Sequence, residues 1–392
     1  MIRTVLIILL AVSVQSTIAQ TSLKAVLDSI TVNNLQIKAS LQNRDAEVVL
    51  ANTGLTPNDP QVDYGYFPGD NSVIGTKSIF NVTQSFYFPT VYTRKKTGAN
   101  LSAEKSGEIH LVRLRQILFQ ASSNYIELAY LNKYADELKK RTSDAENAKT
   151  LAEKRLQTGD ANQLELNKAR MEALRWSNEL RTTNTRIEEK WKILASMNGG
   201  KAMSFSNPEY PLWQLLPVDS IYSMAFRKDP FLKALGFDKK ITANNVKLQN
   251  ALWIPQFKAG YGQETIIDGT YRGIQAGISI PIWQNKNNVK YARLQQLSIE
   301  SSFTAYLQQL KSAIEARYQV VSSLKSTVDE YGKVVESMNS QELLKKSLQT
   351  GNISILEYYR ELSGWYETYD RYLVWQRDYY TEMVYLMQFE LL

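Results

Sequence analysis

The chain has 392 residues, of which 22% are charged and 44% hydrophobic, a composition that excludes an intrinsically disordered protein. Its formal net charge of +7 is a modest basic excess, which we assign mostly to solvated helix faces such as the run Lys139-Lys140-Arg141. The chain contains no cysteine, so neither a disulfide nor a cysteine-linked lipid can hold it.

Residues 1–19 have the pattern of a secretory signal peptide. Arg3 supplies the positive start, Val5 to Val14 form a short apolar run, and Ala19 is the small residue that precedes cleavage. The alternative is an N-terminal membrane anchor, but this apolar run is too short to span a bilayer. We therefore expect an exported protein without a nucleic-acid partner. We also expect no transmembrane helix in the mature chain, because no later apolar run reaches 18 residues.

The mature chain is predicted to begin with a helix and two strands. Apolar residues at helical spacing, from Leu23 to Val49, predict the helix. We expect it to end at Thr53-Gly54, because Pro57 and Pro60 cannot continue it. Apolar residues then alternate with polar ones in two runs: Val62, Tyr64 and Tyr66 in the first, and Phe80, Val82, Phe86 and Phe88 in the second, where Gln84 is the one exception on the apolar face.

A very long helix is predicted next, because no proline occurs from about Val91 to Gln157. At about 1.5 Å per residue this segment could reach roughly 100 Å, far beyond the usual helix of about 11–12 residues. Its apolar or small residues follow steps of mostly four and three, the spacing of a coiled-coil seam. They are Leu114, Leu118, Ala121, Tyr125, Leu128, Ala135 and Leu138.

A tight bend to a second long helix is predicted after this segment. Gly159 can adopt a positive φ and so end the incoming helix. Asn162 is a good N-cap for the next helix, and Glu165, three residues later, could complete a capping box. We also expect Leu156 to pack against Leu164 across the turn.

The second half of the chain repeats these features at an offset of 192 to 195 positions. The ten residues from Leu156 to Glu165 recur as Leu348 to Glu357, with six identities. Other marks recur in the same order: Asn34 as Asp229, Pro60 as Pro255, and Phe88-Pro89 as Ile280-Pro281. We therefore predict a tandem duplication, with repeat 1 over residues 20–200 and repeat 2 over residues 201–392.

Repeat 2 should accordingly contain two strands, a long helical hairpin and a capped bend. Its strand residues are Phe257, Ala259 and Tyr261, then Ile274, Ala276, Ile278 and Ile280. At its bend, Gly351, Ser354 and Glu357 match the glycine, cap and acid of repeat 1, and Leu348 should pack on Leu356. The last helix carries the stripe Trp365, Tyr369, Tyr372, Tyr379, Met383 and Leu386, which we assign to coiled-coil packing rather than to ligand stacking.

The strands allow two interpretations. Their apolar face could cover an ordinary core, or it could face lipid in a membrane barrel whose polar face lines a wet lumen. Four strands cannot close a membrane barrel, because the smallest have about eight. Open edges in lipid would leave backbone groups unsatisfied at several kcal/mol each. A barrel would therefore require several chains to share it.

The two acids after the bends also allow two interpretations. Helix capping is a sufficient reason for Glu165 and Glu357. The alternative is that they are pore-entrance acids, presented by a ring of bends that attracts cations.

The sequence indicates a protein that is not an enzyme. It has one histidine, His110, inside the predicted long helix, and no cysteine. It contains no glycine-rich phosphate loop and no His/Cys cluster with metal-ligand spacing. We expect no catalytic residue, no cofactor and no metal site.

These features together resemble the TolC-like outer-membrane efflux channel family over the whole mature chain. The repeated tips, Arg155 to Gly159 and Ser347 to Gly351, carry most of the resemblance. A weaker match, Phe86 to Tyr92, is similar to the joint between strand and helix in the heavy-metal cation efflux branch.

The resemblance implies a mainly α fold with a small β part: long helical hairpins form an α-barrel, and four strands per chain contribute to a shared trimeric transmembrane β-barrel. It implies an outer-membrane channel that extends into the periplasm and conducts substrates passively. Its implied partners are a periplasmic adaptor and an inner-membrane pump that delivers the substrates. A cation-efflux pump is one candidate for this pump. By motif position, Leu156, Gly159, Leu348 and Gly351 are the adaptor-contact tips. Glu357 matches one acidic position of the family, whereas Arg360 stands where a second acid is expected.

The main rival is a periplasmic adaptor or structural coiled-coil protein without a pore. Such a protein would have no use for duplicated strands with one lipid-compatible face.

Overall fold

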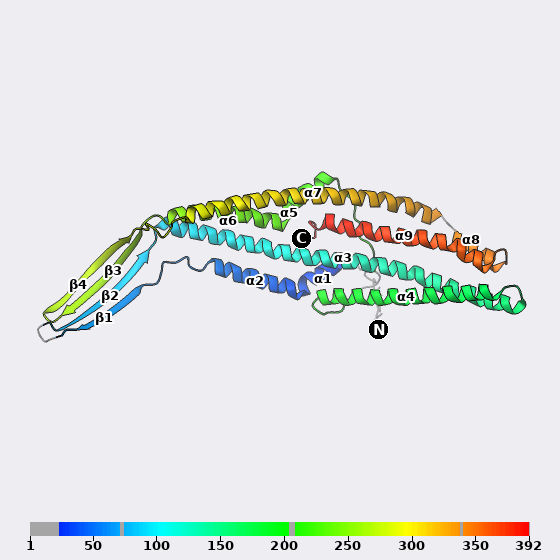
Figure 1. Ribbon diagram of the computed structural model, residues 1–392, viewed down its shortest axis with the longest axis horizontal. Helices are drawn as coiled ribbons and strands as arrows, with labels where there is room; N and C mark the ends of the chain where they lie inside the picture. Colours follow the sequence, from blue (N-terminus) through cyan, green and yellow to red (C-terminus); the bar gives the residue numbers. More distant parts are fainter. Residues whose placement is uncertain (1–22, 71–73, 204–207, 338–339, 392) are drawn as a thin grey trace, which may run out of the picture. The chain divides into compact units, whose positions relative to one another are not determined.

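A computed structural model describes residues 23–70, 74–203, 208–337 and 340–391, so the predicted signal peptide, residues 1–19, lies outside the described residues. The elements in chain order are α1 (Leu23–Asn33), α2 (Leu35–Ala51), β1 (Gln61–Pro68), β2 (Thr76–Phe86), α3 (Pro89–Thr158), α4 (Gln163–Met197), α5 (Val218–Lys228), α6 (Pro230–Ala251), β3 (Gln256–Ile266), β4 (Gly269–Ser279), α7 (Asn288–Ser337), α8 (Ser340–Gln349) and α9 (Ile355–Met387) (Figure 1). Among the described helices, none is both long and apolar enough to cross a bilayer.

The chain divides into two compact units. The described residues of the bend unit are 23–33, 120–203, 208–214, 323–337 and 340–383. Those of the sheet unit are 34–70, 74–119, 215–322 and 384–391. The long helices α3, α7 and α9 each contribute residues to both units.

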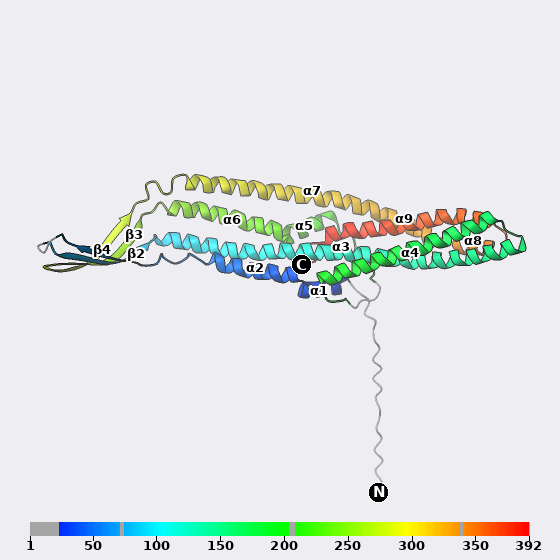
Figure 2. The same cartoon turned by 60° about the horizontal axis from the view of Figure 1, so that its bottom comes forward.

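The sheet unit contains one antiparallel sheet with the strand order β1-β2-β3-β4. The central pair joins the two halves of the sequence, because β2 and β3 pair from Ser78 opposite Thr265 to Phe86 opposite Phe257. Helices α2, α3, α6 and α7 follow one another in that order across the helical part of the unit (Figure 2).

An asparagine caps the start of helix α2, and an aspartate caps the start of helix α6. The expected single opening helix is interrupted at Asn34, whose side chain accepts hydrogen bonds from the backbone N–H groups of Gln36 (2.8 Å) and Ile37 (3.0 Å). Asp229 caps α6 in the same way, through Phe231 (2.7 Å) and Leu232 (3.1 Å). A side-chain oxygen that satisfies the first helical N–H groups makes a new helix start favourable at these positions.

The predicted long helix is confirmed: α3 has 70 residues, and all of its predicted seam residues except Leu114 are buried. The corresponding arm of the second hairpin is assigned as two helices, α7 of 50 residues and α8 of 10 residues. Residues 338 and 339, which separate these two ranges, lie outside the described residues.

The bend unit is held by an apolar core that extends along α3, α4, α8 and α9. Its buried members include Leu138 and Ala152 of α3, Leu166 and Trp176 of α4, and Leu348 of α8. From α9, this core takes Ile355, Tyr358, Tyr359, Leu362 and Tyr366. The predicted aromatic stripe is therefore correct in kind but displaced in part, because Tyr366 is buried while Trp365 only packs against the core.

Candidate functional site

The sheet has one apolar face, and that face is open to solvent in the single chain. Direct partners in antiparallel strands point to the same side, and the register aligns Val62, Val82, Tyr261 and Ile274 in one row. Exposed fractions are 63% for Val62 and 89% for Ile274. The alternation is confirmed, but the ordinary-core interpretation is wrong for these side chains, because an ordinary core would bury them.

The opposite face of the sheet is mainly polar, although Phe67, Ile79 and Tyr271 also lie on it. Its rows contain Asp63 beside Asn81, and Thr83 beside Gly260 and Gln275. Lys77 and Glu264 form an ion pair of 2.6 Å on this side. One face therefore suits lipid, and the other suits water.

The two edges of the sheet are unpaired within the described residues, since β1 pairs only with β2 and β4 pairs only with β3. An exposed edge strand offers a row of N–H and C=O groups to another strand. The apolar face and the edge strands are both surfaces that another chain or a lipid phase could cover.

The first bend is a glycine-terminated helix end. Gly159 has φ of +81°, which favours glycine. The N–H of Asp160 donates to the carbonyl of Arg155 (2.8 Å), and the N–H of Gly159 donates to that of Leu156 (3.3 Å). These two bonds define a Schellman motif, which satisfies carbonyls at the helix end.

The second bend has the same construction. Gly351 has φ of +78°, Asn352 donates to Ser347 (3.0 Å), and Gly351 donates to Leu348 (3.2 Å). Both predicted glycine stops are confirmed.

The helix starts after the bends differ in how completely they are capped. Ser354 and Glu357 form a full capping box: the Glu357 N–H donates to Ser354 Oγ (3.2 Å), and the Ser354 N–H donates to Glu357 Oε2 (2.9 Å). These bonds from Ser354 lower the pKa of Glu357, with a smaller contribution from Arg360. At the first bend the structure shows the cap half of the box, in which Asn162 Oδ1 accepts from the Glu165 N–H (3.0 Å).

The leucine pairs predicted to pack across the bends do not behave as expected. Leu164 is 71% exposed and Leu356 is 45% exposed, although Leu348 is buried. The inward positions after the caps are instead Leu166 and Ile355, because each cap fixes the rotation of the helix that follows it. Leu164 and Leu356 are therefore surface residues of the single chain.

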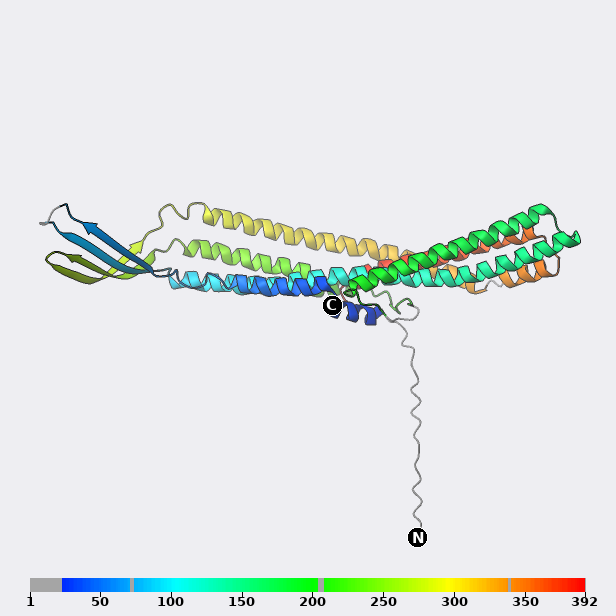
Figure 3. The ribbon, with the colours of Figure 1, turned by 90° about the horizontal axis from the view of Figure 1, so that it is seen from below.

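Two polar contacts that the sequence did not predict join the hairpins near their bends. Arg155 donates from its guanidinium to the carbonyl oxygen of Leu348, and Lys345 pairs with Asp144 at 2.6 Å. Both bends lie at the same end of the bend unit (Figure 3). Arg155 thus holds one tip against the other.

No protein-family model and no curated protein matches the sequence. Solved structures do match. CusC is 14% identical, with a TM-score of 0.75 over 95% of this chain and 92% of that chain. The outer membrane protein VceC from Vibrio cholerae is 13% identical, with a TM-score of 0.77 over 94% and 95%. The CmeC outer membrane channel from Campylobacter jejuni is 14% identical, with a TM-score of 0.71 over 94% and 85%. The chain has the TolC-like channel fold. This similarity confirms the predicted fold class and, at the level of the fold, the predicted resemblance.

A buried arginine connects the two hairpins of this TolC-like chain. Arg141 is 1% exposed and donates to Glu137 (3.0 Å) and, through two nitrogens, to Asp370 (3.0 and 2.7 Å). Its guanidinium lies 5.1 Å from the ring centre of Trp176 and 4.1 Å from that of Tyr366. The assignment of Arg141 to a solvated face is therefore wrong, because two carboxylates and two aromatic rings replace water around it.

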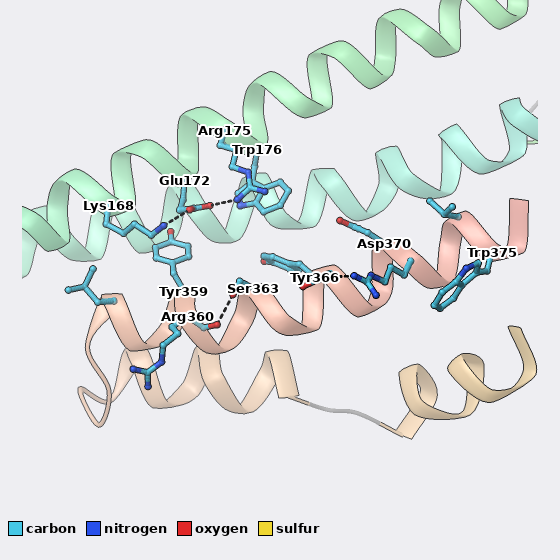
Figure 4. Close-up of a pocket in the computed structure, with 14 residues that line it drawn as sticks. Lys168, Glu172, Arg175, Trp176, Tyr359, Arg360, Ser363, Tyr366, Asp370 and Trp375 are labelled. Carbon is cyan, nitrogen blue, oxygen red and sulfur yellow. Dashed lines mark hydrogen bonds and ion pairs between the residues drawn. The ribbon is translucent and has the colours of Figure 1, made fainter. Parts of the chain in front are cut away.

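A groove of about 800 Å³ opens beside this ion pair, between α4 and α9 (Figure 4). Glu172 binds Lys168 at 2.7 Å and Arg175 at 3.7 Å, while Asp370 is held by Arg141. These carboxylates are already paired within the chain. Among the described residues, moreover, no group of three His, Cys, Asp or Glu could hold a metal ion.

His110 lies in α3 with Nδ1 at 3.1 Å from Ser40 Oγ. Burial lowers its pKa, and Arg44 lowers it further. A hydroxyl partner on a neighbouring helix suits a packing role for this histidine.

Proposed function

We propose that this protein is the outer-membrane channel component of a tripartite efflux system and acts as a passive export conduit. One observation carries the proposal: the four-stranded sheet has an exposed apolar face, a polar opposite face and two unpaired edges. Strands β2, β3 and β4 have 11 residues each, enough to span a bilayer when tilted. Likeness of fold to outer-membrane channels such as CmeC supports the proposal by analogy.

The proposed assembly is a homotrimer. Pairing β4 of one copy with β1 of the next continues the antiparallel order around a ring, so no edge remains in lipid. Three chains supply about 12 strands, above the lower limit of about eight for a closed membrane barrel. The bend units would then lie in the periplasm as an α-barrel.

The tandem duplication, with repeat 1 over residues 20–200 and repeat 2 over residues 201–392, is part of this proposal. The same order of helix pair, strand pair, long helix, bend and last helix in both halves supports it. The matching Schellman motifs at Gly159 and Gly351 support it further.

The proposed partners are a periplasmic adaptor and an inner-membrane pump, with a cation-efflux pump as one candidate. The adaptor would contact the tips at Leu156, Gly159, Leu348 and Gly351, and the exposed Leu164 and Leu356 give these tips an apolar surface. We expect Gly351→Pro to abolish export while the protein still inserts in the outer membrane. Normal export by this variant would contradict the tip assignment.

Glu165 and Glu357 remain candidate pore-entrance acids. Glu357 Oε2 already accepts two bonds from Ser354, which supports a capping role first. Opening would separate the tip hairpins as rigid bodies, biased by the adaptor.

The experiment measures the mass of the detergent-extracted mature protein by light scattering and its conductance in a planar bilayer. We expect three copies per particle and discrete ion-conducting steps. A fully soluble monomer without detergent would exclude the channel and favour the rival, an adaptor or structural coiled coil without a pore.

A further inference from the structure

An apolar groove of about 420 Å³ lies between α5 and α7 in the sheet unit. Ala225 and Phe226 line one side, and Leu307, Leu310 and Ile314 line the other. Phe226 is 61% exposed. An open apolar groove of this kind generally marks a binding surface.

The corresponding surface of the long helix in repeat 1 is already covered. Subtracting the offset of 192 from Leu307 and Lys311 leads to Arg115 and Phe119 on α3. There, the ring of Phe119 packs edge-on against Tyr385, with ring centres 6.4 Å apart. The Arg115 guanidinium lies 5.5 Å from the ring centre of Phe389. The C-terminal end of α9 and the residues just after it therefore cover this surface of α3.

The same segment reaches back to its own repeat. Arg317 of α7 stacks on Tyr385 at 5.1 Å, so the last helix of repeat 2 touches the long helices of both repeats. In repeat 1 the last helix, α4, also contacts its own long helix close to the matching position: Lys190 donates to Asn124 Oδ1 at 3.2 Å. By the same offset, Asn124 corresponds to Ala316, which is adjacent to Arg317.

We propose that the groove between α5 and α7 receives the C-terminal end of α4 from a second copy of this chain. By the offset, Tyr385 and Phe389 correspond to Ile193 and Met197. The contact of Phe119 with Tyr385 becomes Lys311 with Ile193, and that of Arg115 with Phe389 becomes Leu307 with Met197. Ile193 and Met197 thus meet a groove whose lining is mainly apolar, with Lys311 as its charged member, and the pattern inside one chain continues between chains. This inference rests on the proposed duplication and trimer.

The absence of cysteine makes the contact directly testable. The double variant Lys311→Cys with Ile193→Cys is treated with a short bismaleimide in detergent, beside each single variant. We expect the double variant to give covalent dimers and trimers on a denaturing gel, and the single variants to remain single chains. The control pair, Phe119→Cys with Tyr385→Cys, should cross-link without a change of chain number.

A second pair, Leu307→Cys with Met197→Cys, tests the same contact if the first pair fails to fold. Light scattering on the untreated protein tests the trimer separately from the assignment of the groove. A trimer whose test pairs do not cross-link, or cross-link only within one chain, overturns the assignment of the groove but leaves the trimer. A monomer overturns both.

Discussion

Replacing Ile274 by lysine should prevent stable insertion of the sheet, whereas the same change at the neighbouring Gln275 should be tolerated. Ile274 is the sixth of 11 residues in β4 and is 89% exposed on the apolar face. Gln275 pairs with Gly260 on the polar face. The two variants therefore differ in which face of the sheet carries the new charge, and hardly in sequence position.

The magnitude follows from the position of Ile274 at the middle of its strand. A strand of 9–11 residues tilted by about 45° spans a bilayer, which places Ile274 near the midplane. A lipid-facing lysine at that depth costs about 2–4 kcal/mol. In a trimer three copies carry the change, so the total is about 6–12 kcal/mol per assembly. This total is comparable with the whole unfolding free energy of a typical domain, about 5–15 kcal/mol.

The assay is refolding into lipid vesicles, followed by urea titration of the inserted protein. Ile274→Lys should lower both the inserted fraction and the urea midpoint, while Gln275→Lys should match the parent protein. Equal behaviour of the two variants would refute the assignment of the faces. Normal insertion of Ile274→Lys would refute the lipid-facing role of this sheet.

Three further predictions concern the bend unit. Arg141→Met leaves the buried Glu137 without its ion-pair partner and should lower the unfolding free energy by about 3–5 kcal/mol, measured by chemical denaturation. The control Lys139→Met, at an exposed site in the same helix, should change this free energy by less than about 0.5 kcal/mol. Gly351→Ala should lower the unfolding free energy by about 1 kcal/mol because position 351 has a positive φ. Gly364→Ala, in open space within α9, should raise it by about 0.4–1 kcal/mol. A change of the same sign in both variants would contradict the bend geometry. Glu357→Gln should destabilise at neutral pH, because the ionised carboxylate caps α9. Because folding lowers the pKa of Glu357, its carboxylate stabilises the folded state above the ordinary pKa of 4.5. This stabilisation disappears as the pH falls through the pKa of the folded state. A difference in denaturation midpoint between parent and variant that persists below this pH range would show that the charge is not the cause.

Local chemistry explains why much of the bends and strands could be predicted. A glycine with positive φ, an N-cap and an acid three residues later act within one turn of helix, so Gly159, Ser354 and Glu357 could be interpreted without a tertiary structure. Period-two alternation likewise fixed which residues share a face, because it follows from strand geometry alone. The offset of 192 to 195 positions between the two halves could also be read directly, because the repeated marks are short local segments.

Only the tertiary structure decided which faces are covered and by what. Arg141 lies in a run of three basic residues, and its burial depends on Asp370, Trp176 and Tyr366, which are far away in sequence. The exposure of Leu164, where packing was expected, depends on the rotation that the caps impose on the following helix. The sequence by itself determined the long helix α3, the strands and the bends, because those signals are local and periodic. The tertiary structure decided that the apolar face of the sheet, its two edges and the groove beside α7 stay open in a single chain, because covering them depends on contacts between distant segments.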